Sequence, residues 1–354
     1  MRLLYLAPTF LSYRLHKRVR GVQVFDLQFI PDLARLGVHV TVPAEITWRP
    51  RLRQLLPDHP NIRVRYTPPL FKPLWNGLYA AAALGGRFDA AFVGNPARGL
   101  IPPIDLMLRR GLFQRIVLQA NRGPHPRAAA ALRRWPLRAV AVSEQVRADF
   151  PPDLRPHVDV YYGVLDADRF APPTPAQSPP PEPVRFALLG KLDNPWKGAD
   201  TAVDAFLSLP PSVRGRCQLH LISFDQPPQR LAAHADIVTH PWLPAERVPD
   251  LLRSMHVLLV PSSAGETFSQ VMVQGMLTGL PVLASALPVL AEKLDTGGGV
   301  VCADGPALAA AMAAMAQDPE LRARHGVIAR RVALERYVWD TRAFVDRFLF
   351  PATP

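Results

Sequence analysis

The chain has 354 residues, 49% of them hydrophobic, and its 41 Lys and Arg residues outnumber 29 Asp and Glu. This length accommodates two α/β domains with sizeable cores. The only cysteines, Cys217 and Cys302, lie far apart without metal-ligand spacing, which excludes a disulfide scaffold and favours a reducing cytoplasm. No apolar run reaches the about 18 residues of a membrane span. Residues 2–7 are expected to form a first strand rather than a signal peptide, because basic residues follow without a small-residue cleavage site.

The positive charge is concentrated in the first half of the chain. Residues 1–170 hold 25 Lys and Arg against 12 Asp and Glu, whereas residues 171–354 hold 16 against 17. This asymmetry indicates an anionic partner for the first half, such as a membrane surface, a nucleic acid or an acidic acceptor. The competing interpretation is a genomic bias towards arginine, because Arg outnumbers Lys 36 to 5.

Short apolar runs alternate with amphipathic segments in the first half. A strand at residues 2–7 is followed by a loop, by a helix expected over 23–36, and by Gly37 as its C-cap. Ser143 and Glu144 are expected to open a later helix. Further strands are predicted at residues 38–42, 90–93, 116–119 and 139–142. This order predicts a parallel sheet covered by helices.

The second half repeats this alternation after a proline-rich linker. Residues 171–183 hold seven prolines, which favour extended chain over a hydrogen-bonded ladder. Strands are predicted at 185–189, 218–223, 237–239, 257–260 and 282–284, and helices at 199–207, 246–254, 306–315 and 319–334. The domains are therefore expected at residues 1–170 and 184–335, with 336–354 as a last helix. Both are expected to be Rossmann-like, doubly wound α/β domains.

Residues 257–285 form the most informative stretch. A strand at 257–260 ends at Pro261, a loop contains Glu266, and Ser269 is expected to cap a helix that Gly279 and Pro281 stop. Open parallel sheets bind ligands at the carboxyl ends of their strands, which is where this loop lies. The alternative is an ordinary solvated carboxylate near a helix start.

Two lysines indicate a phosphate site in the second half. Lys191 and Lys197 lie within one window between a strand and a helix, in a chain that has few lysines. Cations beside a helix amino terminus bind anions, so the window predicts a diphosphate site. Solvated surface charge is the alternative.

The same residues resemble family 4 glycosyltransferases. Pro261-Ser262, the Glu266-x-Phe268 pair, and the Met276-x-x-Gly279-x-Pro281-Val282 run are similar to the donor-sugar motif of that family. The resemblance implies a GT-B fold, in which two Rossmann-like domains face each other across a cleft and a C-terminal helix crosses back to the first domain. It implies a hexosyltransferase that uses a nucleoside diphosphate sugar as co-substrate, with retention, and with neither a cofactor nor a metal ion.

The resemblance also assigns roles to single residues. The second glutamate of the motif is replaced here by Gln274, whose amide still accepts and donates hydrogen bonds but carries no charge. The implied assignments are Glu266 and His125 as catalytic residues; Lys191, Lys197 and Gly21 for the diphosphate; Glu266, Thr267, Phe268 and Ser269 for the sugar; and Gln274, Trp242 and Leu243 for the ribose and base. Trp242 as core packing and His125 as an ordinary loop histidine are the competing interpretations.

Three functions are compatible with these observations. The first is a cytoplasmic glycosyltransferase, peripheral at the inner face of a membrane, with a glycan, lipid-linked or small-molecule acceptor. The second is a catalytically weak sugar-nucleotide binder, which Gln274 suggests. The third is a basic nucleic-acid-binding protein, but no nucleic-acid motif supports it, and no nucleic acid is expected as a partner.

Overall fold

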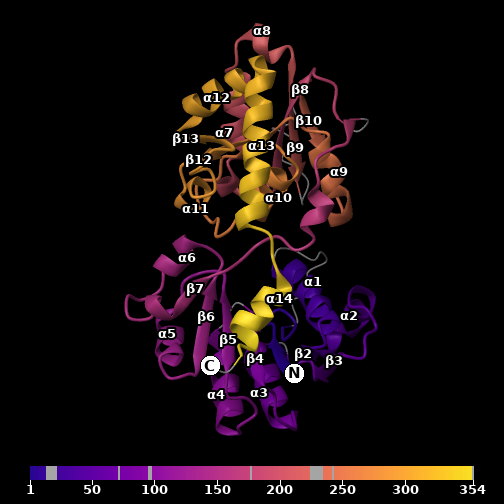
Figure 1. The fold of residues 1–354 in the computed structure, drawn as a ribbon, viewed down its shortest axis with the longest axis vertical. Coiled ribbons are helices and arrows are strands. Elements are labelled where there is room, and N and C mark those ends of the chain that lie inside the picture. The colour runs from indigo at the N-terminus through magenta and orange to yellow at the C-terminus, as the bar shows by residue number, and fades with distance from the viewer. Residues whose placement is uncertain are drawn as a thin grey trace. The chain divides into compact units, whose positions relative to one another are not determined.

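The structure is a computed structural model that describes residues 1–12, 22–70, 72–94, 98–175, 178–223, 234–240 and 243–352. It divides into two compact units. The first comprises Met1–Leu165 together with Asp340–Pro354, and the second comprises Asp166–Trp339. Each unit is a parallel sheet with helices on both faces (Figure 1).

The first unit is built on a seven-stranded parallel sheet of order β3-β2-β1-β4-β5-β6-β7. Its strands are β1 (Arg2–Leu6), β2 (His39–Glu45), β3 (Ile62–Thr67), β4 (Ala90–Gly94), β5 (Ile116–Ala120), β6 (Leu137–Ala141) and β7 (Val158–Val160). Its helices are α1 (Val22–Arg35), α2 (Arg49–Leu55), α3 (Pro73–Ala83), α4 (Ile101–Arg109), α5 (Pro126–Leu132), α6 (Glu144–Ala148) and α14 (Thr341–Phe344). The order reverses direction between β1 and β4, as in dinucleotide-binding folds.

The second unit has a six-stranded parallel sheet of order β10-β9-β8-β11-β12-β13. Its strands are β8 (Val184–Gly190), β9 (Cys217–Ser223), β10 (Ile237–His240), β11 (Val257–Val260), β12 (Val282–Ser285) and β13 (Gly299–Cys302). Its helices are α7 (Ala199–Leu207), α8 (Pro211–Arg214), α9 (Val248–Arg253), α10 (Gln270–Leu277), α11 (Pro288–Ala291), α12 (Gly305–Gln317) and α13 (Pro319–Arg336). Phe186, Phe206 and Met312 are fully buried and join the sheet to helices α7 and α12. The two doubly wound sheets confirm the predicted fold class.

The end of the chain packs on the first unit. The Tyr161 hydroxyl donates a hydrogen bond of 2.9 Å to the carbonyl of Asp340. The ring of Phe344 on α14 lies 5.5 Å from Phe29 and 6.0 Å from Phe92, between centroids. Helix α14 continues into a π-helical turn, Val345–Leu349, whose Phe348 is also buried. A cluster of aromatic side chains therefore holds the last helix against α1 and β4.

The boundary between the units falls at Leu165–Asp166 rather than at residue 170. A guanidinium nitrogen of Arg253 on α9 donates to the carbonyls of Arg169, at 3.0 Å, and Ala171, at 3.4 Å. These bonds attach the start of the proline-rich segment to helix α9, so the segment is already part of the second unit at residues 169–171.

Several elements differ from the sequence prediction. Helices α2, α3 and α4 and strands β3 and β13 were not predicted. A helix opens at Ser143-Glu144 as predicted, and Ser143 is its N-cap, since its hydroxyl accepts from the Val146 amide at 3.2 Å. The predicted capping by Ser269 is wrong: this residue precedes α10 in the left-handed region, at φ 64°, and its side chain makes no cap hydrogen bond in the described structure.

One buried carboxyl in the first unit makes stability depend on pH. The Tyr5 hydroxyl donates to Oδ1 of Asp26 at 2.7 Å, and both side chains are almost fully buried. Burial raises the pKa of Asp26 to about 7, although the hydrogen bond from Tyr5 lowers it. Between the ordinary pKa and this value, the native state keeps a proton that the unfolded chain releases. The free energy of unfolding therefore falls as pH rises through this window.

Asp26→Asn removes this titration but keeps an oxygen that accepts from Tyr5. The wild type is expected to lose about 2 kcal/mol of unfolding free energy as pH rises from about 5 to about 8, because one pKa unit is about 1.4 kcal/mol. The variant should not show this loss, so its stability relative to the wild type should increase by that amount over the same range. Denaturant titrations at the two pH values measure this gain. The exposed Asp58→Asn is the matched control and should show no such trend. Parallel pH profiles for Asp26→Asn and the wild type would contradict the assignment.

Candidate donor-binding site

The candidate site lies at the carboxyl ends of β8 and β11, where the strand order of the second sheet reverses direction. The two strands are parallel neighbours, with Leu259 in register with Leu188. Helix α7 follows β8 and α10 follows β11. The loops after these strands therefore meet at the point where open α/β sheets bind ligands.

An ion pair joins the two loops. Nζ of Lys197 lies 2.5 Å from Oε1 of Glu266, and the Ser262 hydroxyl donates to the same oxygen at 2.9 Å. The Glu266 side chain is 9% exposed and that of Lys197 is 30% exposed. The Ser285 hydroxyl in turn donates to the carbonyl of Ser262. The carboxylate is thus fixed in place by a cation and a hydroxyl, which is the arrangement that orients a group for a ligand.

The backbones of the two loops are also in direct contact. Gly198 adopts φ +70°, and a Cβ there would lie 2.1 Å from the carbonyl oxygen of Pro261. The Ser263 amide donates to the carbonyl of Trp196 at 2.8 Å. Only glycine permits both the left-handed conformation and this approach. The contact places Lys197, one position earlier, within reach of Glu266.

Two helix amino termini open at this edge. Within the described chain, no side chain caps α7 at Gly198 or α10 at Ser269. The dipoles of both helices favour negative charge at this edge. With Lys197 between them, the edge can accept a diphosphate.

A buried lysine supports the loop that carries Glu266. Lys293 is 0% exposed, and its Nζ donates to Glu292 Oε1 at 3.0 Å and to the Val289 carbonyl at 2.9 Å. The same nitrogen lies 4.9 Å from the ring centroid of Phe268 and 5.0 Å from that of Tyr337. Burial lowers the pKa of Lys293, whereas burial and then Glu292 raise the pKa of Tyr337 to about 12. The Phe268 ring is thus held by packing and cation–π contact rather than presented to solvent.

The structure places the remaining predicted site residues as follows. Lys191 is exposed and pairs with Asp193 at 3.2 Å, whereas Lys197 pairs with Glu266. Gln274 and Leu243 are half-buried, on α10 and in the loop after β10. His125 is exposed in the loop between β5 and α5 of the first unit. Gly21 and Trp242 lie outside the described residues, and Thr267 lies half-buried beside Glu266.

Three residues of this edge were not assigned a role from the sequence. The Trp196 side chain is 56% exposed, and a Cβ on Gly265 would lie 3.3 Å from its ring. An exposed tryptophan ring offers a stacking face to a ligand at this edge. Ser262 and Lys293 act through Glu266 and Phe268, which sequence spacing does not reveal. Trp196 could have been identified from the sequence, because it directly precedes Lys197, which was already a candidate site residue.

Geometry separates the two predicted diphosphate lysines. Lys197→Ala is expected to weaken nucleoside diphosphate binding by about 1.5–3 kcal/mol, the range for hydrogen bonds to charged groups. Lys191→Ala is expected to weaken it by no more than about 1 kcal/mol, because an exposed charge is screened. Calorimetric titration with each variant measures the difference, and the exposed Lys72→Ala in the first unit is the control. Unchanged affinity in Lys197→Ala would remove this residue from the site.

Known proteins resemble parts of this chain. Residues 183–318 match the family model described as glycosyl transferases group 1. Over 191 residues, 34% are identical to a D-inositol 3-phosphate glycosyltransferase of Streptomyces griseus, covering 49% of this chain and 40% of that protein. Over 202 residues, 31% are identical to a phosphatidyl-myo-inositol mannosyltransferase of Mycobacterium tuberculosis, covering 52% and 51%. The chain thus spans about half the length of the curated relatives it matches.

Solved structures show the same fold along the whole chain. The Anabaena protein HepE, in complex with UDP, superposes with a TM-score of 0.72 at 16% identity and 97% coverage of both chains. A glycosyltransferase from Rickettsia africae superposes with a TM-score of 0.75 at 15% identity and 99% coverage of both chains. Residues 183–318 therefore match the glycosyl transferases group 1 family, and the chain as a whole has the GT-B fold.

Proposed function

We propose that the protein transfers a hexosyl group from a nucleoside diphosphate sugar to an acceptor hydroxyl. The observation that carries this proposal is the Lys197–Glu266 pair, in which Nζ and Oε1 are 2.5 Å apart. The two residues lie in the loops that lead into α7 and α10. The cation and the amide groups are suited to the diphosphate, and the carboxylate is suited to sugar hydroxyls. A UDP-sugar is the first donor to test, because a structural neighbour is described in complex with UDP-glucose.

We further propose that transfer proceeds with retention at the anomeric carbon and without a metal ion. As the bond to the sugar breaks, negative charge grows on the departing diphosphate. Lys197, Lys191 and the amino ends of α7 and α10 supply positive charge there, which stabilises a transition state by pre-arranged electrostatics. His125 is proposed as the first unit's contribution to catalysis, and Gln274 as a ribose contact.

The acceptor is proposed to be a ring alcohol that bears a phosphate. Two relatives are named for inositol phosphate and phosphatidyl-inositol acceptors, and the first half of this chain is basic. A free phosphorylated polyol and its lipid-linked form share this chemistry. Offering both forms to the protein with the same donor separates them.

A donor screen tests the proposed function. Ligands of the native state raise the melting temperature, so UDP-, GDP-, ADP- and dTDP-sugars are compared by thermal shift. The donor that stabilises the protein is then offered with acceptors, and the anomeric configuration of the product is read by proton NMR. Stabilisation without turnover would favour the weak sugar-nucleotide binder that Gln274 suggests. The absence of any shift with all four donors would overturn the proposal.

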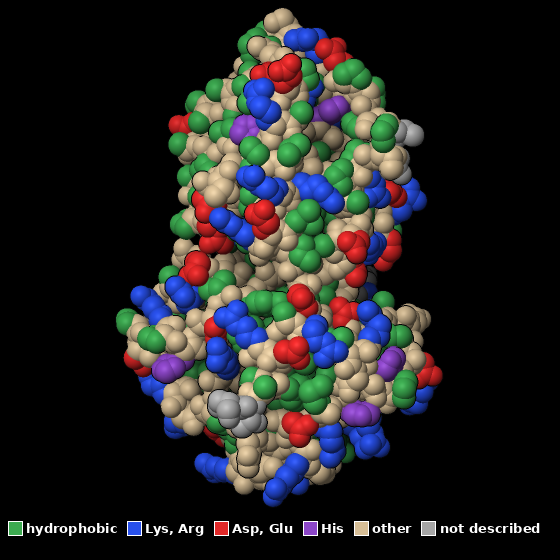
Figure 2. All heavy atoms as spheres, in the orientation of Figure 1, with side chains coloured by type: hydrophobic (Ala, Val, Ile, Leu, Met, Phe, Trp, Pro, Cys, Tyr) green, Lys and Arg blue, Asp and Glu red, His purple; other side chains and the backbone are tan. Residues whose placement is uncertain are grey.

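Association with an anionic membrane surface at the cytoplasmic face is a separate proposal. It rests on the basic first half, whose Arg14, Lys17, Arg18 and Arg20 lie outside the described residues. Within the described chain, no helix has the length and hydropathy to cross a bilayer. On the face seen in Figure 2, the Lys and Arg of the first unit are interspersed with Asp and Glu. Vesicle co-sedimentation is expected to increase with anionic lipid and to fall when those four residues become Gln.

A further inference from the structure

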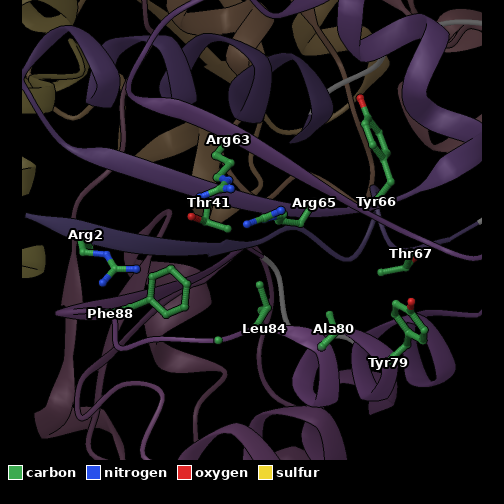
Figure 3. A pocket seen from close by; sticks show the side chains of 12 residues that line it. Arg2, Thr41, Arg63, Arg65, Tyr66, Thr67, Tyr79, Ala80, Leu84 and Phe88 are labelled. Carbon is green, nitrogen blue, oxygen red and sulfur yellow. The ribbon is translucent and has the colours of Figure 1, made fainter.

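A pocket of about 270 Å³ lies in the first unit between the sheet and helix α3 (Figure 3). Thr41 on β2 and Arg63 and Arg65 on β3 line the sheet side. Tyr79, Leu84 and their neighbours at the carboxyl end of α3 line the other side. Arg2, the first residue of β1, also lines the pocket, which therefore reaches the amino end of this strand. The carboxyl end of β1, from which the chain continues to α1, lies at the opposite edge of the sheet. It belongs to a different unit from the Lys197–Glu266 pair.

The lining carries concentrated positive charge. Arg2, Arg63 and Arg65 contribute three guanidinium groups, and no Asp or Glu is among the described lining residues. In Figure 3 the head groups of Arg63 and Arg65 lie close together beside Thr41, and Arg2 points into the same pocket. Cations that converge in this way repel one another unless an anion lies between them.

Carboxylates do not neutralise these arginines within the described chain. Arg35, Arg133 and Arg138 of the same unit form ion pairs with Asp32, Asp153 and Asp159. None of the ion pairs between described residues includes Arg2, Arg63 or Arg65, and the nearby Asp89 accepts from the backbone amide of Arg2, at 2.7 Å. The three guanidiniums thus keep their planar pairs of donors for a ligand, and such pairs match the oxygens of a phosphate.

The rest of the pocket is apolar and aromatic. Phe88 is 6% exposed and lies 5.5 Å below the guanidinium carbon of Arg2, while Leu84 is 7% exposed. Tyr79 remains 45% exposed at the mouth. A phosphate alone would make no contact with these apolar side chains. The volume, at the small end of ligand pockets, fits a phosphate carrying one ring or short apolar group.

We propose that this pocket binds a phosphorylated small molecule, with the phosphate on Arg63, Arg65 and Thr41 and its ring or apolar part against Phe88 and Leu84. A free phosphorylated metabolite and a phospholipid headgroup share this chemistry. The site stands apart from the proposed donor site, so it does not depend on transferase activity. It gives the basic first unit a defined anionic ligand.

Calorimetric titration of the full chain with phenyl phosphate tests the proposal, with inorganic phosphate and benzyl alcohol as the two part-ligands. The wild type should bind phenyl phosphate more tightly than either part. Arg63→Gln/Arg65→Gln should weaken it at least about tenfold, and Arg63→Lys/Arg65→Lys by less, because lysine keeps the charge but not the two-pronged donor geometry. The control Arg109→Gln/Arg115→Gln removes the same charge from exposed arginines outside the pocket and should change affinity less than about twofold.

Lys191→Ala/Lys197→Ala separates this site from the diphosphate site, since it should retain phenyl phosphate binding. Loss of binding in that variant, or equal affinity in the wild type and Arg63→Gln/Arg65→Gln, would overturn the proposal. Because Arg63 and Arg65 are exposed, their variants should keep the wild-type melting temperature, which verifies folding. Vesicles of phosphatidylglycerol and of phosphatidylcholine then identify the source. Retention on the anionic vesicles that depends on Arg63 and Arg65 indicates a headgroup, and its absence indicates a soluble ligand.

Discussion

Replacing Glu266 by glutamine is expected to lower sugar transfer by about 10²–10³-fold, the range measured when one pre-arranged polar contact to a transition state is removed. Glutamine keeps the size of the side chain and one oxygen that accepts from Ser262, whose hydroxyl now lies 2.9 Å from the carboxylate. It removes the charge that pairs with Lys197. Steady-state kinetics with the donor found by thermal shift measure the effect.

Nucleoside diphosphate binding should respond to Glu266→Gln in the opposite direction. In the structure, Lys197 is paired with Glu266, so an incoming diphosphate competes with the carboxylate for the same ammonium group. Without that competition, the diphosphate should bind equally well or more tightly. A loss of transfer together with preserved nucleotide affinity therefore distinguishes a sugar contact from general damage to the site.

A double-mutant cycle and a matched control complete this test. Lys197→Met, Glu266→Gln and the double variant give the coupling between the two side chains, which is expected to exceed about 0.5 kcal/mol because they are in contact. Glu335→Gln removes an exposed carboxylate from α13 of the same unit and should leave transfer unchanged. Wild-type transfer rates in Glu266→Gln would exclude Glu266 from catalysis.

Much of the second unit could be predicted from the sequence because local signals agree with the tertiary structure there. The apolar run of β11 ends before a proline, and the helix after it ends at Leu277, just before Gly279, so strand, loop and helix were placed correctly. Lys197 and Glu266 were each identified, but their pairing was not. They are 69 positions apart, and their contact depends on β8 and β11 being neighbours, which no spacing encodes.

The region between β2 and β4 was missed for identifiable reasons. Strand β3 alternates Ile62, Val64 and Tyr66 with arginines, a half-buried pattern, but it is short and closely bounded by prolines. Helix α3 is apolar almost throughout and begins at Pro73 without a side-chain cap, so periodicity gives little contrast. The pocket of Arg63 and Arg65 lies in this region and was invisible to a motif-based analysis.

Gly198→Ala is expected to have the largest effect on the architecture of the donor site. A methyl group at this position would lie 2.1 Å from the carbonyl oxygen of Pro261 and 2.9 Å from its carbonyl carbon. Because the overlap involves backbone on both sides, it cannot be relieved by rotating a side chain. The loops after β8 and β11 must separate, and the Lys197–Glu266 contact should lengthen with them.

The expected loss is about 2–4 kcal/mol of stability in the second unit, since overlap and left-handed strain add. Gly279→Ala isolates the strain: its φ is +84°, but its Cβ would meet only Pro172 at an ordinary 3.7 Å. That control should lose about 1–2 kcal/mol and keep donor affinity.

Hydrogen exchange of β8 and β11 amides reports the stability of this unit by itself. Gly198→Ala should increase exchange there and weaken nucleoside diphosphate binding, because the cation and the carboxylate would no longer be held at one edge. Equal exchange rates and equal affinities in the two variants would show that the approach of Gly198 to Pro261 does not shape the site.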